Sequence, residues 1–137
     1  MAADRADNTE QELLKLTKQL LDSIGAADWA AYEKLCDPTI TCFEPEARGH
    51  VVEGLPFHKF YFDLPAPQVK PAVATQVTMA SPHVRLMGDA AVVSYARLNQ
   101  KLGPSGDPVT VVIEETRVWQ KLNGAWKHVH FHRSPPG

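Results

Sequence analysis

The chain has 137 residues, of which 44% are hydrophobic and 22% are charged, so it is long enough for one globular domain with a single core. Its 14 basic and 16 acidic residues give a net charge of −2, which excludes the strong positive field that non-specific nucleic-acid binding needs. The chain has only two cysteines, no apolar run of membrane length and no targeting peptide, so we expect reduced thiols, no membrane contact and a cytoplasmic location.

The first predicted element is a long helix near the N-terminus. Residues 1–8 are polar, and we expect them to form a disordered leader. Thr9 and Glu12 then have the spacing of a capping box, and Gly25 is a suitable C-terminal stop. Between them an apolar face recurs at helical spacing in Leu13, Leu16, Leu20 and Ile24. A second, short helix is predicted from an N-cap at Asp28 to Leu35.

The rest of the chain predicts mainly β-structure. A short strand at 39–43 is followed by a turn-rich connection into another strand and by a short helix at 57–63. The segment LPAPQVKP contains three prolines and is expected to be an exposed loop. Longer strands are predicted at 72–79 with a continuation at 82–87, and then at 90–102, 109–122 and 125–134. One long helix followed by an antiparallel meander predicts an α+β fold, a single domain over residues 9–137 with the sheet curled around the helix.

The segment WKHVHFHRS near the C-terminus has histidines at alternate positions. On a regular strand His128, His130 and His132 would share one face. Zinc needs three or four convergent ligands, which His58 or Glu115 could complete. Alternatively, histidines at alternate positions form a half-polar face of the sheet or a contact between subunits. We adopt this second interpretation and predict neither a metal nor another cofactor.

Three arginines lie inside apolar strand segments, at Arg97, Arg117 and Arg133. A guanidinium stays charged, so when it is buried it must be paired or hydrated. The three could form salt bridges at the rim of the sheet with Glu114 and Glu115, or they could form a cup that accepts a carboxylate from a ligand. Composition and spacing alone favour the salt bridges.

Whether two of these arginines meet depends on the hairpin at Asn123-Gly124. A two-residue loop would place Arg117 and Arg133 on opposite faces. A three-residue loop with Gly124 as a bulge would shift the pairing by one residue and bring them onto one face. The Asn-Gly sequence suits both loops, so local chemistry leaves the choice open.

The chain has no motif of a nucleophilic enzyme or of a protein kinase. It contains no G-x-S-x-G sequence, no P-loop, and neither the H-R-D nor the D-F-G sequence of kinases. An acid–base enzyme remains the alternative function, such as an isomerase or dehydratase with a carboxylate or histidine in a β-lined pocket.

Five segments in order resemble the association (hub) domain of calcium/calmodulin-dependent protein kinase II: TEQELLKLTKQLLDSI, CDPTITCFEPEARGHVVEG, FHKFYFD, SPHVRLMGDAAVVSYARLNQ and EETRVWQKLNGAWKHVHFHRS. The resemblance runs from about residue 9 to residue 135. FEPEA, FH-x-FYF, EETRVW and VHFHRS are specific as a set. The resemblance implies a nuclear transport factor 2-like, or cystatin-like, fold, in which a long helix is cradled by a strongly curved antiparallel sheet.

The resemblance also implies a function, that of a non-catalytic oligomerisation domain whose main partner is itself. Hub domains form dimers that assemble into two stacked rings, a dodecamer, tetradecamer or larger assembly. In the serine/threonine kinase they gather catalytic domains and raise their effective concentration. Met1 stands a few residues before the hub helix, which fits either a piece of a longer protein or a stand-alone hub-like protein.

The family's arginine-lined pocket is proposed to accept carboxylates from small acids or from kinase-linker peptides. The matching positions are Arg97, Arg117, Arg133, His58 and Tyr61. The resemblance therefore favours the three-residue hairpin loop, and it favours the carboxylate cup over the salt bridges. The proline-rich DLPAPQVKP and the alanine-containing TQVTMASP depart from the more polar loop of animal members.

Overall fold

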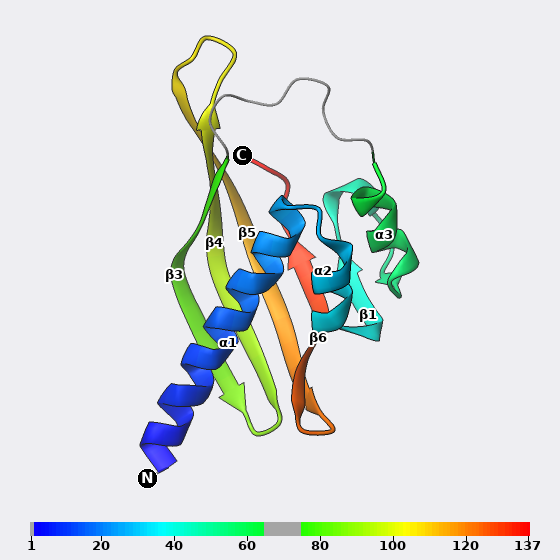
Figure 1. Cartoon of the computed structure of the whole chain (residues 1–137), viewed down its shortest axis with the longest axis vertical. Coiled ribbons are helices and arrows are strands. Elements are labelled where there is room, and N and C mark those ends of the chain that lie inside the picture. The colour runs from blue at the N-terminus through cyan, green and yellow to red at the C-terminus, as the bar shows by residue number, and fades with distance from the viewer. Residues whose placement is uncertain (1, 65–74) are drawn as a thin grey trace.

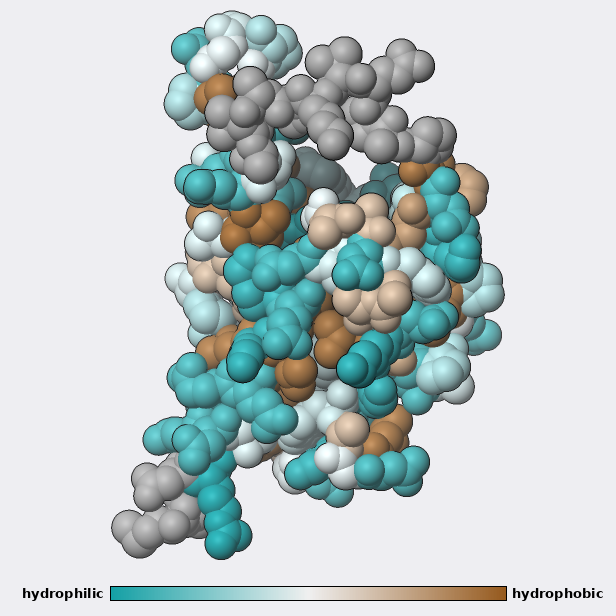
Figure 2. Space-filling model, viewed as in Figure 1, coloured by the Kyte–Doolittle hydropathy of each residue, from teal (hydrophilic) through white to brown (hydrophobic). Residues whose placement is uncertain are grey.

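The long N-terminal helix, α1 (Ala2–Gly25), lies across the concave side of a curved sheet in the computed structural model, which describes residues 2–64 and 75–137 (Figure 1). Its inner face is fully buried at Leu13, Thr17, Leu20 and Leu21. Nε1 of Trp119 in the sheet donates a hydrogen bond to Oγ1 of Thr17 at 3.1 Å. The opposite face of the helix is largely hydrophilic (Figure 2). Thus the predicted apolar face is the one that packs on the sheet.

The start of α1 differs from the prediction. The helix begins at Ala2, whereas the sequence predicted a leader over residues 1–8 and a helix start at Thr9, which lies inside the helix. Residues 2–8 contain no glycine or proline that would stop a helix from extending. The predicted end at Gly25 is confirmed.

Two short helices follow the predictions closely. In α2 (Trp29–Leu35) the Oδ1 atom of Asp28 accepts a hydrogen bond from the backbone N–H of Ala31 at 3.2 Å, which is the predicted N-cap. The predicted helix at 57–63 is α3 (Pro56–Phe62). Their aromatic side chains pack together, with the rings of Tyr32 and Phe62 4.9 Å apart between centroids. This contact fixes α3 beside α2.

The sheet consists of β1 (Cys36–Phe43), β2 (Val52–Glu53), β3 (Gln76–Met87), β4 (Ala90–Leu102), β5 (Pro108–Leu122) and β6 (Ala125–Arg133), with a 3₁₀ turn at Pro45–Ala47. The strand order is β2-β1-β6-β5-β4-β3. The predicted meander from β3 to β6 is confirmed, but β1 pairs with β6 in parallel. A parallel pair leaves no turn signal in the sequence, because its strands are far apart in the chain. The proline-rich loop and the first residues of the strand predicted at 72–79 lie outside the described residues.

The β5–β6 hairpin has the two-residue loop, so the three-residue loop that the family resemblance favoured is wrong. Asn123 and Gly124 have φ of 52° and 82°, as a type I′ turn requires, and Leu122 pairs with Ala125. The one-residue shift occurs instead in mid-strand. The pairing is irregular there and leaves Val129 without a partner, which is a β-bulge.

This bulge breaks the predicted row of three histidines. His128 pairs with Trp119 and faces the core, with no exposed surface. Beyond the bulge, His130 pairs with Val118 on the other face of the sheet, where its Nδ1 lies 2.7 Å from Oγ1 of Thr41. The prediction failed because it assumed unbroken alternation along the strand.

Candidate functional site

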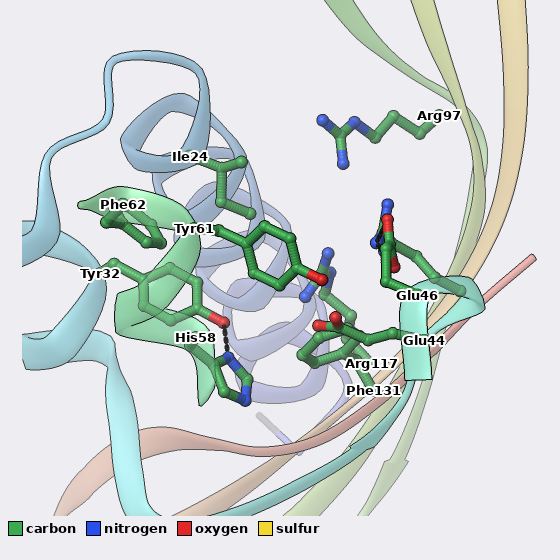
Figure 3. Close-up of a pocket in the computed structure, with 11 residues that line it drawn as sticks. Ile24, Tyr32, Glu44, Glu46, His58, Tyr61, Phe62, Arg97, Arg117 and Phe131 are labelled. Carbon is green, nitrogen blue, oxygen red and sulfur yellow. Dashed lines mark hydrogen bonds and ion pairs between the residues drawn. The ribbon is translucent and has the colours of Figure 1, made fainter. Parts of the chain in front are cut away.

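A cavity of about 220 Å³ lies between α3, the end of α1 and the concave face of the sheet (Figure 3). The five residues that the family resemblance predicted all line it: Arg97, Arg117, Arg133, His58 and Tyr61. The rest of the lining is formed by Ile24, Tyr32, Glu44, Glu46, Phe62 and Phe131. The cavity is smaller than the roughly 300–1,000 Å³ typical of drug-sized ligands, so it suits a small molecule or a single side chain.

The bulge in β6 brings the three arginines to this cavity. Arg97, Arg117 and Arg133 come from the adjacent strands β4, β5 and β6. Past the bulge, Arg117 pairs with Phe131, so Arg133 falls on the same face as Arg117. The three arginines therefore converge as predicted, but the cause is the β-bulge in β6 and not a three-residue hairpin loop. From the other side, His58 and Tyr61 project from one turn of α3.

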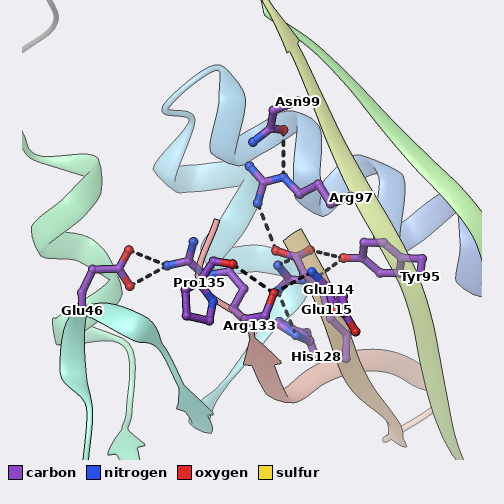
Figure 4. A network of polar contacts seen from close by, with 11 residues as sticks. Glu46, Tyr95, Arg97, Asn99, Glu114, Glu115, His128, Arg133 and Pro135 are labelled. Carbon is purple, nitrogen blue, oxygen red and sulfur yellow. Dashed lines mark hydrogen bonds and ion pairs between the residues drawn. The ribbon is translucent and has the colours of Figure 1, made fainter. Parts of the chain in front are cut away.

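Glu115 is the partner of two of the arginines, and its side chain is 0% exposed (Figure 4). Its Oε2 accepts a hydrogen bond from Nη1 of Arg97 at 3.1 Å, and its Oε1 accepts one from Nη2 of Arg117 at 3.2 Å. Burial raises the pKa of Glu115, but the two guanidiniums outweigh burial and hold this pKa below its usual value. The three side chains form a buried, fully ionised triad.

Arg117 is held on every side and is 1% exposed. Its Nε donates to the hydroxyl of Tyr95 at 2.8 Å, and its Cζ lies 4.7 Å from the ring centroid of Phe131. Its Nη1 lies 3.5 Å from Nε2 of His128, which must accept because an arginine can only donate. The ring proton of His128 is then on Nδ1, which faces Sγ of Cys36 at 3.5 Å. Burial lowers the pKa of His128, in keeping with a neutral ring.

Arg133 is the most accessible of the three and has a different partner. Its Nη2 contacts Oε1 and Oε2 of Glu46 at 2.8 and 2.7 Å, and the two side chains are 18% and 41% exposed. The predicted salt-bridge partner Glu115 is thus correct for the other two arginines, whereas Glu114 is wrong. Among the described residues, Glu114 contributes its backbone N–H, which donates to Oγ of Ser134 at 2.8 Å.

A chain of polar contacts runs from α2 into the cavity. Burial raises the pKa of Tyr32, so its hydroxyl keeps its proton, and its oxygen lies 2.6 Å from Nδ1 of His58. Burial and Arg117 lower the pKa of His58 to about 4, so this ring is neutral. Nε2 faces Sγ of Cys42 at 3.8 Å, and that thiol donates to Oε1 of Glu44 at 3.7 Å. Glu44 is the acceptor at the end of this chain of contacts.

Glu44 is 8% exposed, and its carboxylate points into the cavity (Figure 3). Its Oε2 is the one buried side-chain nitrogen or oxygen without a hydrogen-bond partner in the part of the chain that the structure describes. Burial raises the pKa of this carboxyl. Sequence reasoning gave no role to Glu44 or Glu46. The signal was present in the motif FEPEA, which contains both.

No group of three or more histidine, cysteine, aspartate or glutamate side chains that could hold a metal ion occurs within residues 2–64 and 75–137. The two cysteines are separate, buried free thiols. In the same described ranges, no helix is long and apolar enough to cross a membrane.

Residues 9–137 match the model of the calcium/calmodulin-dependent protein kinase II association domain. The chain belongs to this family. It is 48% identical over 126 residues to calcium/calmodulin-dependent protein kinase type II subunit delta of Oryctolagus cuniculus, a match that covers 91% of the chain and 23% of that relative. The chain thus spans about a quarter of the length of the curated relative.

Solved structures of the association-domain family agree with the fold. The hub homology domain from C. reinhardtii is 56% identical, with a TM-score of 0.83 over 92% of this chain and 97% of that one. The association domain of C. elegans is 42% identical, with a TM-score of 0.85 over 96% and 99% of the two chains. A nuclear transport factor 2-like protein from Salmonella enterica, at 23% identity and a TM-score of 0.71, shows the wider fold alone. The predicted α+β cone is therefore confirmed.

Proposed function

We propose that this chain is a non-catalytic self-association domain that assembles through dimers into two stacked rings. The observation that carries the proposal is the match to the association-domain family over residues 9–137. A ring of this kind raises the effective concentration of whatever is tethered to its subunits, without any new contact between the tethered parts. The predicted cytoplasmic location stays a prediction.

The convex face of the sheet supports self-association. Helix α1 packs on the concave side (Figure 1), so the side chains that alternate with the buried ones along each strand face outward. On β4 and β5 many of these are apolar or small: Ala90, Val92, Ala96, Leu98, Val112 and Val118. Val112 is 39% exposed in the isolated chain. An uncovered sheet face of this composition suits packing against the same face of a second copy.

Native mass spectrometry at micromolar protein tests the assembly. The expected result is a species of a dozen or more subunits, and a monomer or simple dimer overturns the ring model. Val112→Glu places a charge in the proposed interface and should shift the mass to smaller species. The matched control is Leu102→Glu, because Leu102 is 46% exposed at the far end of β4, beyond the apolar part of this face.

The same domain, in our proposal, binds carboxylates of small acids or linker peptides in the arginine-lined cavity. The support is the placement of three guanidiniums, His58 and Tyr61 around one small space. All three arginines already contact carboxylates of the chain. Arg133 is the one best able to exchange its partner, because Glu46 is 41% exposed and can be solvated when it is displaced.

Titration calorimetry with a short carboxylic acid such as butanoate tests this binding. Arg133→Ala and Arg117→Ala are each expected to weaken the affinity by about tenfold or more, as loss of a charged hydrogen bond would. Arg133→Ala is the cleaner test, since Arg117 also neutralises buried Glu115. Arg48→Ala, an exposed arginine outside the cavity lining, is the control. Unchanged affinity in Arg133→Ala would refute the assignment.

One observation keeps the acid–base enzyme as a second candidate. That function requires an inward carboxylate or histidine with a strongly shifted pKa. Glu44 points into the cavity, and burial raises its pKa. Glu44 would act as a base towards a proton beside a carbonyl group. Exchange of the α-protons of 4-oxopentanoate in heavy water, followed by NMR, tests it. Exchange at the rate of buffer alone removes this candidate, whereas faster exchange that is lost in Glu44→Gln supports it.

A further inference from the structure

Glu44 has an unfilled hydrogen-bonding position that faces the cavity. Within residues 2–64 and 75–137, its Oε1 is reached only by a weak thiol donor, Sγ of Cys42 at 3.7 Å. Its Oε2 has no partner in these ranges, although Glu44 is 92% buried, the complement of its 8% exposure. A buried acceptor without a donor is unfavourable, and such a group at a cavity wall is satisfied when a bound molecule supplies the donor.

The protein groups around Glu44 do not fill this position. Tyr32, His58 and Cys42 form a chain of contacts that ends at its other oxygen. Nη2 of Arg133 contacts both oxygens of Glu46. The described residues thus supply no donor for Oε2, and a molecule in the cavity can supply one.

The charges around the cavity also favour a particular ligand. Three guanidiniums face it, from Arg97, Arg117 and Arg133. Three carboxylates balance them: Glu44 and Glu46 in the lining and Glu115 behind it. A carboxylate that takes the place of Glu46 at Arg133 keeps this balance, but it leaves Oε2 of Glu44 without a donor. A molecule that also carries an ammonium group supplies that donor and a counter-charge for buried Glu44.

We propose that Glu44 makes the cavity selective for small zwitterions, namely ω-amino acids whose carboxylate contacts Arg133 and whose ammonium group donates to Oε2 of Glu44. This inference rests on the proposed carboxylate site and adds a second anchor to it. The raised pKa of Glu44, caused by burial, fits an acceptor that lacks a counter-charge in the empty cavity. An ammonium group that approaches Oε2 supplies this counter-charge.

Calorimetry at pH 7 with pairs of ligands of equal length tests the selectivity: 4-aminobutanoate against butanoate, and 6-aminohexanoate against hexanoate. In the wild-type protein at least one amino acid is expected to bind about tenfold or more tightly than its unsubstituted partner, the usual gain from a charged hydrogen bond. If the plain acids bind and the amino acids bind no better, the inference is wrong and the carboxylate site stands. If neither kind binds, the proposed carboxylate site fails as well.

Variants assign the selectivity to one residue. Glu44→Gln keeps the shape of the side chain and removes its charge, so the preference for the amino acid should disappear while the affinity for the plain acid is kept or increased. Glu44→Ala, which removes the unpaired oxygen altogether, gives the same readout if the glutamine variant fails to fold. Glu46→Gln is the matched control, because Glu46 lines the same cavity but already pairs with Arg133. Loss of the preference in Glu46→Gln and not in the Glu44 variants contradicts the role of Glu44.

Discussion

Glu115→Gln removes one negative charge from the centre of the domain and leaves the side chain almost the same size. In the wild-type protein this carboxylate is the shared ion-pair partner of Arg97 and Arg117, whose side chains are 11% and 1% exposed. The variant therefore keeps two guanidiniums in nearly dry surroundings without a counter-ion. The amide also turns one of the two acceptor oxygens into a donor, which faces the arginine donors unfavourably.

The size of the effect follows from the burial of the arginines. Removing one partner of a buried ion pair lowers the free energy of unfolding by about 3–5 kcal/mol, because the other charge stays buried and unpaired. The matched control is Glu46→Gln, in which the lost partner of Arg133 is 41% exposed and water can replace it. For such exposed pairs the expected loss is only about 0–1 kcal/mol.

Urea denaturation followed by tryptophan fluorescence measures both variants, since Trp119 is fully buried and reports on unfolding. All proteins are compared at one concentration, because self-association stabilises the folded state by mass action. Glu115→Gln should lose at least about 2 kcal/mol more than Glu46→Gln. Losses that agree within about 1 kcal/mol would show that Arg117 does not depend on Glu115, and the description of a buried triad would then be wrong.

Three further predictions concern the stability of the domain. The pKa of His58 is about 4 in the folded protein and about 6.5 in the unfolded chain. The stability that is present above pH 6.5 is therefore lost as the pH falls towards 4, by about 3 kcal/mol. An acid denaturation series checks this, and His58→Gln should remove that part of the pH dependence. Thr17→Val leaves Nε1 of Trp119 buried without its acceptor and should lower the urea-unfolding free energy by about 1–3 kcal/mol. Asp28→Ala removes the cap of α2 and should lower the thermal stability by about 1 kcal/mol, whereas Asp28→Asn should restore most of it.

Local signals account for the elements that the sequence predicted well. Asp28 caps α2, Gly25 ends α1, and the Asn123-Gly124 turn closes a hairpin, because each of these features depends on a few consecutive residues. The parallel pairing of β1 with β6 depends on contacts across most of the chain, and nothing near either strand indicates it. The residues of the cavity were found through the family resemblance, since periodicity alone favoured salt bridges. Both interpretations describe part of the structure, because the arginines that line the cavity are also ion-paired.

The bulge at Val129 is the feature that local reasoning missed, although β6 contains a sign of it. Trp126 and Phe131 are both buried, and they stand five positions apart. On a regular strand residues at odd spacing face opposite sides, so two large buried aromatics at this spacing require one extra residue between them. Val129 is that residue. The correct argument for convergence of the arginines thus starts from the core side chains of β6 and not from the loop.

The bulge also determines the electrostatics of the cavity. Because of it, His128 lies inside and takes a hydrogen bond from Arg117, while Arg133 reaches the same face farther along the strand. Arg117 is then fixed by its neighbours and forms an ion pair with Glu115, whereas Arg133 at the rim can exchange Glu46 for another carboxylate. The two guanidiniums are therefore unequal: the inner one stabilises the fold and the outer one is available to a ligand. Substitution of Arg133 should therefore weaken carboxylate binding more than it lowers the stability of the domain. Substitution of Arg117 should reduce both the binding and the stability.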